Sequence, residues 1–184
     1  MAAMEAAKAV WNLIGEDQIE NFVVVGGAAL LFHGSELMTV DADLAITGDS
    51  LEKFIKSVHR DARFTKTVME GWEFQSSYGF MVEVDFLDKS GAGGFLHEFT
   101  QYSVVDGVPV ATLVDLALGK RGSWMDQGRP KDLDALEWIL VKMAEQRVDF
   151  SRVGMEICIL QDIVTALPQT AQGRRISLGI RNLL

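Results

Sequence analysis

Two aspartates separated by one residue are the first feature of this sequence that could do chemistry. Asp41 and Asp43 lie in residues 39–46, a stretch whose composition and alternation predict a strand. Side chains at i and i+2 of a strand point to the same face, so the two carboxylates are expected side by side. Two like charges that close repel unless a proton or a cation lies between them. Because Mg²⁺ is held in proteins by one or two carboxylates together with substrate phosphates, the pair predicts a magnesium site.

A glycine pair precedes these aspartates. Residues 22–25 form a β-branched apolar run that predicts a buried strand, and Gly26 and Gly27 break it. Residues 28–33 then predict a short apolar helix that Gly34 closes. The turn offers free backbone N–H groups and the positive end of a helix dipole, which suits a phosphate group.

The order of these features resembles the nucleotidyltransferase superfamily, which has the polymerase-β-like fold. Its signature is a Gly-Gly or Gly-Ser turn that opens a helix, followed by a strand with two acidic residues one apart. Here 13 residues separate Gly27 from Asp41. A narrower likeness is to the small branch of minimal nucleotidyltransferases and abortive-infection toxins, and it is carried by Gly26, Gly27, Ala28, His33, Gly34, Thr39, Asp41, Asp43 and Leu44. The branch has a basic residue two positions before the threonine, where this chain has Leu37, so one expected phosphate contact is missing.

A second acidic strand is predicted at residues 80–87. Its alternation places Val82, Val84 and Phe86 on one face and Met81, Glu83, Asp85 and Leu87 on the other. The resemblance implies that Asp85 is the third carboxylate, which helps to hold the metal and deprotonates the attacking hydroxyl. Glu83 is the alternative candidate, and a solvated strand face is the plain structural interpretation of both.

Basic residues recur in the second half of the chain. A helix is predicted from Thr112, a loop at residues 122–128, and a further helix that Pro130 opens. The resemblance implies that Lys120, Arg129 and Lys131 contact the triphosphate or close the base pocket, together with Asp132. The helix dipole alone would favour Asp132 in a first helical turn, and Lys120 could simply extend from a packed face to water.

The pattern of elements predicts an α+β fold, a nucleotidyltransferase-like mixed β-sheet flanked by helices. We expect a core at residues 1–111 and a helical extension packed on it at residues 112–184. Further predicted elements are a helix at 2–14, two or three strands within 63–86, a hairpin at 102–110 and a helix at 151–167. The tail 173–184 combines arginines with aliphatic residues and could meet a protein partner or a second copy.

Composition narrows the function classes. The net charge of −9 argues against broad nucleic-acid binding, which depends on clustered Lys and Arg, and is easier to reconcile with a nucleoside triphosphate or a protein partner. The single cysteine, Cys158, excludes an internal disulfide and has the apolar context of a buried structural thiol. No signal peptide or membrane-spanning run is visible, so a cytoplasmic protein is expected.

Three hypotheses about function follow. The first is a magnesium-dependent nucleotidyltransferase with one or two Mg²⁺ ions on Asp41, Asp43 and Asp85, an ATP-like nucleotide as donor and an unknown hydroxyl acceptor. The second is a protein of the same fold that binds a nucleotide or partner without catalysis. The third is a pocket reused for another reaction on an organic metabolite, lined by His33 and the four tryptophans. For His33, a hydrogen bond to a backbone carbonyl at a helix end is the favoured interpretation.

Overall fold

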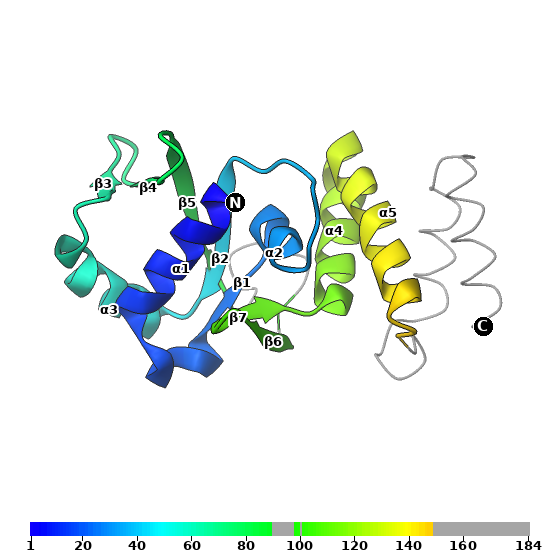
Figure 1. The fold of residues 1–184 in the computed structure, drawn as a ribbon, viewed down its shortest axis with the longest axis horizontal. Helices are drawn as coiled ribbons and strands as arrows, with labels where there is room; N and C mark the ends of the chain where they lie inside the picture. Colours follow the sequence, from blue (N-terminus) through cyan, green and yellow to red (C-terminus); the bar gives the residue numbers. More distant parts are fainter. Residues whose placement is uncertain (90–97, 100, 149–184) are drawn as a thin grey trace. The chain divides into compact units, whose positions relative to one another are not determined.

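The computed structural model describes residues 1–89, 98–99 and 101–148 (Figure 1). Contacts divide the chain into two compact units, Met1–Thr112 and one that begins at Leu113, and each is described by itself. The packing of a helical extension on the core therefore stays a prediction. Cys158, the helix predicted at 151–167 and the tail at 173–184 lie outside the described residues.

One mixed sheet organises the first unit. Its described strands are β1 (Phe22–Val24), β2 (Asp41–Ile46), β3 (Phe64–Lys66), β4 (Trp72–Gln75), β5 (Met81–Asp88), β6 (Tyr102–Val105) and β7 (Val108–Ala111). Their order is β3-β4-β5-β2-β1-β7-β6. β2 is parallel to β5 and β1 is parallel to β7, whereas the other neighbours are antiparallel. The predicted fold class, a mixed sheet flanked by helices, is confirmed.

The helices of the first unit are α1 (Ala2–Ile14), α2 (Gly26–Phe32) and α3 (Gly48–Ser57), with short 3₁₀ turns at Glu16–Asn21 and Val58–Arg60. α1 packs against α2, α3, β2 and β5. Its alanine-rich face allows a close approach to the sheet, and Trp11 stacks on Phe22 of β1 with ring centroids 5.3 Å apart. The bounds of α1 confirm the helix predicted at residues 2–14.

Phe54 of α3 lies at the centre of a cluster of aromatic rings between this helix and the sheet. It is fully buried, and its ring lies 5.4 Å from Phe64, 5.4 Å from Trp72 and 4.9 Å from Phe86. These rings come from β3, β4 and β5, so a single helix residue joins three strands. Burying a phenylalanine side chain contributes about 1.5–3 kcal/mol, and edge-to-face pairs add to that.

Two helices form the described part of the second unit, α4 (Leu113–Gln127) and α5 (Pro130–Glu145). Pro130 occupies the first turn of α5, as predicted, because the first turn needs no backbone donor there. The prediction of a loop at residues 122–128 is wrong, since α4 continues through Gly122 as far as Gln127. An interior glycine costs about 1 kcal/mol relative to alanine, which neighbouring helix formers can offset. The helix ends instead at Gly128, whose φ is 62° and whose N–H donates to the Trp124 carbonyl at 2.7 Å.

Within the described residues, no helix combines the length and the apolar character needed to cross a membrane.

Candidate metal centre

The parallel pairing of β2 and β5 brings two acidic strands together. In this register Asp41 stands opposite Glu83, and Asp43 stands opposite Asp85. Residues directly opposite each other in a sheet project to the same face, so the four carboxylates share one side. The intervening Ala42 and Leu44 are fully buried on the other side. The alternation that the sequence predicts for both strands is therefore present.

Three of these carboxylates converge. Asp41, Asp43 and Asp85 each offer one oxygen, and the three oxygens lie within 4.8 Å of one another. All three side chains are partly buried, so they are shielded from bulk water yet open to a ligand. Three hard oxygen donors from two adjacent strands fit a divalent cation such as Mg²⁺ or Mn²⁺, whose remaining positions water or phosphate oxygens can fill.

The electrostatics of Asp85 agree with such a centre. Burial raises the pKa of the Asp85 carboxyl above its ordinary value, and the nearby negative charge of Asp41 raises it further. Without a cation, ionisation of Asp85 is therefore less favourable than it would be in water. A divalent ion would remove that repulsion and favour the fully ionised cluster.

The glycine pair is fitted closely to the acidic strand. Gly26 has φ of 59°, and a Cβ added there would lie 1.8 Å from Asp43 Oδ2. A Cβ on Gly27 would lie 2.4 Å from Thr39 Oγ1. Real Cβ atoms do not approach other atoms so closely, so only glycine leaves room for these two side chains. The sequence suggests that the two glycines let a phosphate approach the backbone. The structure adds a second reason for glycine at both positions, because a side chain there would collide with Asp43 or Thr39.

Thr39 is a positioning residue whose role the sequence pattern does not reveal. Its Oγ1 donates a hydrogen bond of 2.5 Å to Asp41 Oδ1. The same side chain covers Gly27, as its close approach shows. Thr39 thus restricts the rotamer of Asp41, in the way that outer groups orient the ligands of metal sites. Its presence in the matched motif was the one signal that could have indicated this role.

Glu83 does not join the cluster. It is exposed and lies opposite Asp41 on β2 and Glu73 on β4. Although it faces Asp41, its side chain stays in solvent, and its carboxylate is not among the three that converge. Asp85 is therefore the carboxylate of β5 that converges with the aspartates of β2.

Two basic residues of the second unit contact Asp132. This carboxylate is fully buried and accepts hydrogen bonds from Lys120 Nζ at 2.9 Å and from Arg129 Nε at 2.8 Å. Burial alone would raise the pKa of Asp132, but the hydrogen bonds and charges of Lys120 and Arg129 outweigh it and hold the pKa below its ordinary value. Lys131 is exposed. The local arrangement is thus a buried carboxylate between two cations that join α4 to the start of α5.

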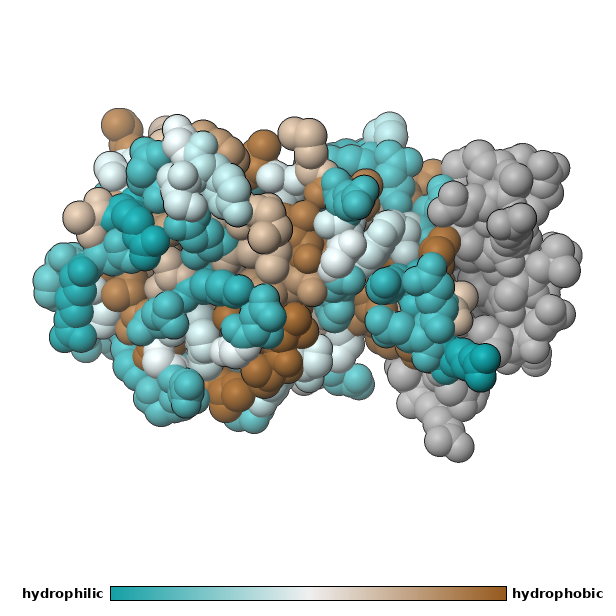
Figure 2. Space-filling view, viewed as in Figure 1, coloured by the Kyte–Doolittle hydropathy of each residue, from teal (hydrophilic) through white to brown (hydrophobic). Residues whose placement is uncertain are grey.

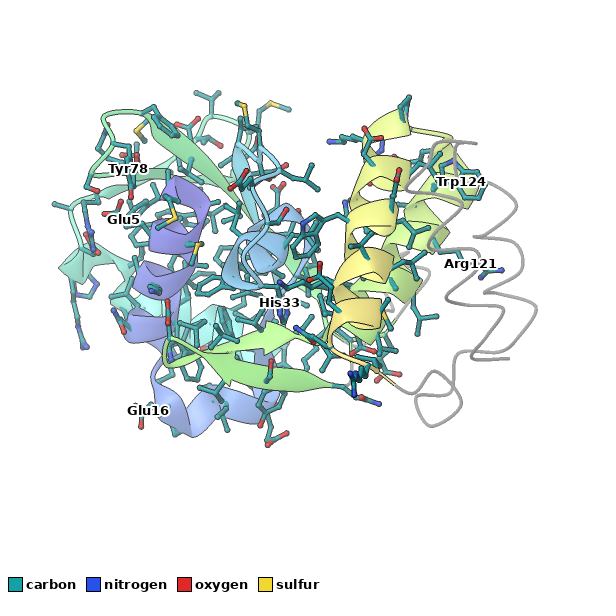
Figure 3. The ribbon with its side chains drawn as sticks, turned by 45° about the vertical axis from the view of Figure 1, so that its right-hand side comes forward. Glu5, Glu16, His33, Tyr78, Arg121 and Trp124 are labelled. Atoms are coloured by element: carbon teal, nitrogen blue, oxygen red, sulfur yellow. The ribbon has the colours of Figure 1, made fainter. Side chains whose placement is uncertain are left out.

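His33 and two of the tryptophans have structural contacts. His33 Nε2 lies 2.8 Å from the carbonyl oxygen of Ala111, the last residue of β7 (Figure 3), which confirms the predicted bond from a helix-end histidine to a backbone carbonyl. Trp11 and Trp72 contact Phe22 and Phe54 in the core rather than lining a pocket with His33.

The position of the missing basic residue lies in the segment between α2 and β2. Leu37 is about one-third exposed, and its backbone N–H donates to Ser35 Oγ at 3.1 Å. Its neighbours are Glu36 and Met38, so residues 34–41 contain no positive charge.

Comparison with solved structures agrees with this architecture. The chain is similar to an antigenic nucleotidyltransferase-like protein from Paracoccidioides brasiliensis, with a TM-score of 0.60 and 16% identity over 95% of this chain and 93% of that one. It is also similar to a proposed nucleotidyltransferase from H. pylori, with a TM-score of 0.52 and 9% identity over 100% and 95% of the two chains. At such identities the likeness shows the fold alone, and that fold is nucleotidyltransferase-like. No family model matches the sequence. No curated protein matches it either.

Proposed function

We propose that this chain is a metal-dependent nucleotidyltransferase, which moves a nucleotidyl group from a nucleoside triphosphate to a hydroxyl acceptor. The observation that carries the proposal is the convergence of Asp41, Asp43 and Asp85 on two adjacent strands. A fold by itself does not imply an activity, but this cluster supplies the chemistry that phosphoryl-group transfer needs.

The three carboxylates take different roles in this proposal. Asp41 and Asp43 hold a divalent ion, and Thr39 keeps Asp41 in the orientation for it. When bound, the ion neutralises negative charge on the triphosphate. Asp85 completes the ligand set and accepts the proton of the acceptor hydroxyl, a role that its raised pKa supports.

Phosphate contacts are proposed for the glycine pair and for the basic residues. Gly26 and Gly27 lack side chains that would keep a triphosphate from the backbone at the start of α2. Lys120 and Arg129 share one carboxylate between two positive charges, which leaves the Asp132 cluster with a net positive charge. Lys131 is exposed and next to this cluster. The candidate donors to the phosphates are thus five residues: Gly26, Gly27, Lys120, Arg129 and Lys131.

Nucleotide binding without transfer is the second candidate function, and the replacement of the branch's basic residue by Leu37 favours it. A triphosphate bound without that contact would be held less firmly in line with an acceptor, which lowers the rate more than the affinity. The two candidates share the metal centre and differ in whether pyrophosphate is released.

One experiment separates them. Each nucleoside triphosphate is titrated calorimetrically into the protein with Mg²⁺ or with EDTA, and pyrophosphate release is then followed at saturating nucleotide with cell-derived RNA and protein as acceptors. The Asp41→Asn/Asp43→Asn variant removes two charges from the cluster. The Glu73→Gln/Glu83→Gln variant is the matched control, because it removes two charges from the same sheet face outside the cluster.

We expect Mg²⁺-dependent binding that is lost in the aspartate variant and kept in the glutamate variant. Pyrophosphate release would then support the transferase, and binding without any release would favour the second candidate. Absence of metal-dependent binding by the unmodified protein would overturn both.

A further inference from the structure

Exposed apolar side chains gather at one edge of the first unit. Of the 11 large hydrophobic residues exposed in the described part of the chain, six lie in two short segments, residues 37–40 and 78–81. We name them together the apolar rim: Leu37, Met38, Val40, Tyr78, Phe80 and Met81. Singly exposed apolar residues need no explanation, but clusters of them mark interaction sites.

The sheet register brings these two segments together. One leads into β2 and the other into β5, and these parallel strands begin side by side with Asp41 opposite Glu83. Both segments therefore lie at the same end of the sheet, where β2 and β5 begin, and Figure 1 shows this end along the top of the first unit. Figure 2 shows hydrophobic atoms along that edge, interrupted by polar ones. Met38 is 93% exposed, and Phe80 is 50% exposed.

The turn that carries half of the rim is held in place. Glu5 of α1 accepts hydrogen bonds from the Ser77 backbone N–H and Oγ, both at 2.9 Å. Ser76 Oγ donates to the Phe80 carbonyl at 2.8 Å. Figure 3 shows Tyr78 at this outer edge, near Glu5. The rim is thus presented on a braced turn, which lowers the entropic cost of binding a partner.

The charged residues in the two chain segments that carry the rim, and directly after them on β2 and β5, are acidic. Residues 34–41 and 76–85 contain Glu36, Asp41, Glu83 and Asp85 but no Lys or Arg. Arg63 is the basic side chain that reaches this turn through Glu5, and it is already paired with Glu5 and Asp61. A second copy of this chain would bring a like net charge of −9, and an anionic lipid surface would be repelled as well.

We propose that the apolar rim is a docking surface for a protein partner that presents an amphipathic segment with apolar side chains flanked by Lys or Arg. The apolar face of that segment covers Met38, Val40 and Phe80, and its basic residues meet the acidic fringe. The surface adjoins Asp41, so the docked partner also limits access to the metal centre. The docking itself does not depend on the proposed transferase activity.

The test uses the full chain and a synthetic helix-forming peptide of Leu and Lys that has one apolar face. Two comparison peptides keep its length, one with Glu in place of Lys and one with the Leu and Lys positions scrambled. Fluorescence anisotropy measures binding to the unmodified protein and to Met38→Ser/Phe80→Ser. The matched control is Val68→Ser/Met69→Ser, which removes two exposed apolar side chains from the β3–β4 turn.

We expect the amphipathic Lys peptide alone to bind, with an affinity that falls as salt is added. The rim variant should bind about tenfold more weakly or not at all, and the control variant should bind like the unmodified protein. Weak or equal binding of all three peptides would overturn the proposal. So would binding to phosphatidylglycerol vesicles in place of the peptide, or self-association in sedimentation velocity that the rim variant abolishes. Because no nucleotide or metal is added, a failure here leaves the proposed transferase untouched.

Discussion

Gly26 lies directly against the carboxylate of Asp43. The distance of 1.8 Å that a Cβ at Gly26 would have from Asp43 Oδ2 makes a side chain at this position incompatible with the observed site. Gly26 also has φ of 59°, a conformation that residues with a Cβ rarely adopt. The start of α2 and the acidic strand β2 are therefore packed together with no space for a side chain between them.

Gly26→Ala should weaken Mn²⁺ binding at least about tenfold, because the added methyl group must displace a ligand carboxylate. It should also cost about 1 kcal/mol or more in folding free energy, because alanine is strained at positive φ. Gly34→Ala is the control, since Gly34 has φ of 88° but no atom within 4 Å of its added Cβ. Calorimetric titration with Mn²⁺ and urea denaturation measure the two effects. Equal losses of Mn²⁺ affinity in both variants would show that strain alone is responsible.

Thr39→Val should lower Mn²⁺ affinity about tenfold with little change in stability. Valine keeps the shape that covers Gly27 but removes the hydrogen bond to Asp41 Oδ1. Thr39→Ser should restore most of the affinity, because it restores the hydroxyl. If the valine and serine variants bound Mn²⁺ alike, the hydroxyl would have no role in positioning Asp41.

The raised pKa of Asp85 predicts a pH dependence of the metal-free protein. In the range between the ordinary aspartate pKa and the raised value, the folded state binds more protons than the unfolded state. Stability therefore falls as pH rises through that range. Asp85→Asn, which carries no charge, should raise the thermal midpoint of the metal-free protein near neutral pH, and the gain should vanish in acid.

Scanning calorimetry in EDTA across a pH series measures this difference. Glu83→Gln is the control on the same strand, because Glu83 is exposed and outside the cluster. A thermal midpoint of Asp85→Asn that stays below that of the unmodified protein at neutral pH would contradict the expected repulsion.

Asp132→Asn should destabilise the helical unit by about 1.5–3 kcal/mol, because it removes the buried carboxylate that accepts hydrogen bonds from Lys120 and Arg129. The pKa of Asp132 is lowered, so its stabilising contribution is present above the ordinary aspartate pKa and is lost as pH falls through the lowered value. Denaturation followed by the fluorescence of Trp124 and Trp138 measures the change. Asp134→Asn is the control, because Asp134 is exposed on the same helix and should change stability by less than about 0.5 kcal/mol. A similar loss in both variants would argue against a specific buried ion cluster.

Several parts of this site follow from local sequence rules. The run at residues 22–25, the glycine break and the alternation of Asp41 with Asp43 each depend on neighbours in the chain, so the strand–helix–strand order is predictable. The same holds for the hairpin predicted at residues 102–110, which β6 and β7 form, and for Pro130 at the start of α5. The helix break predicted at Gly122 failed because the cost of one interior glycine is small compared with the rest of a 15-residue helix.

Other parts were decided only by tertiary structure. Alternation places Glu83 and Asp85 on one face of β5, and the register sets each of them opposite an aspartate of β2. Tertiary structure separates the two, because Asp85 is partly buried and converges with Asp41 and Asp43, whereas Glu83 is exposed. Likewise, Lys120 and Asp132 lie on different helices, and their bond depends on how α4 and α5 pack. Strand register and helix packing are set by contacts between residues far apart in the chain. The sequence alone therefore determined which carboxylates were available, and long-range pairing determined which of them meet.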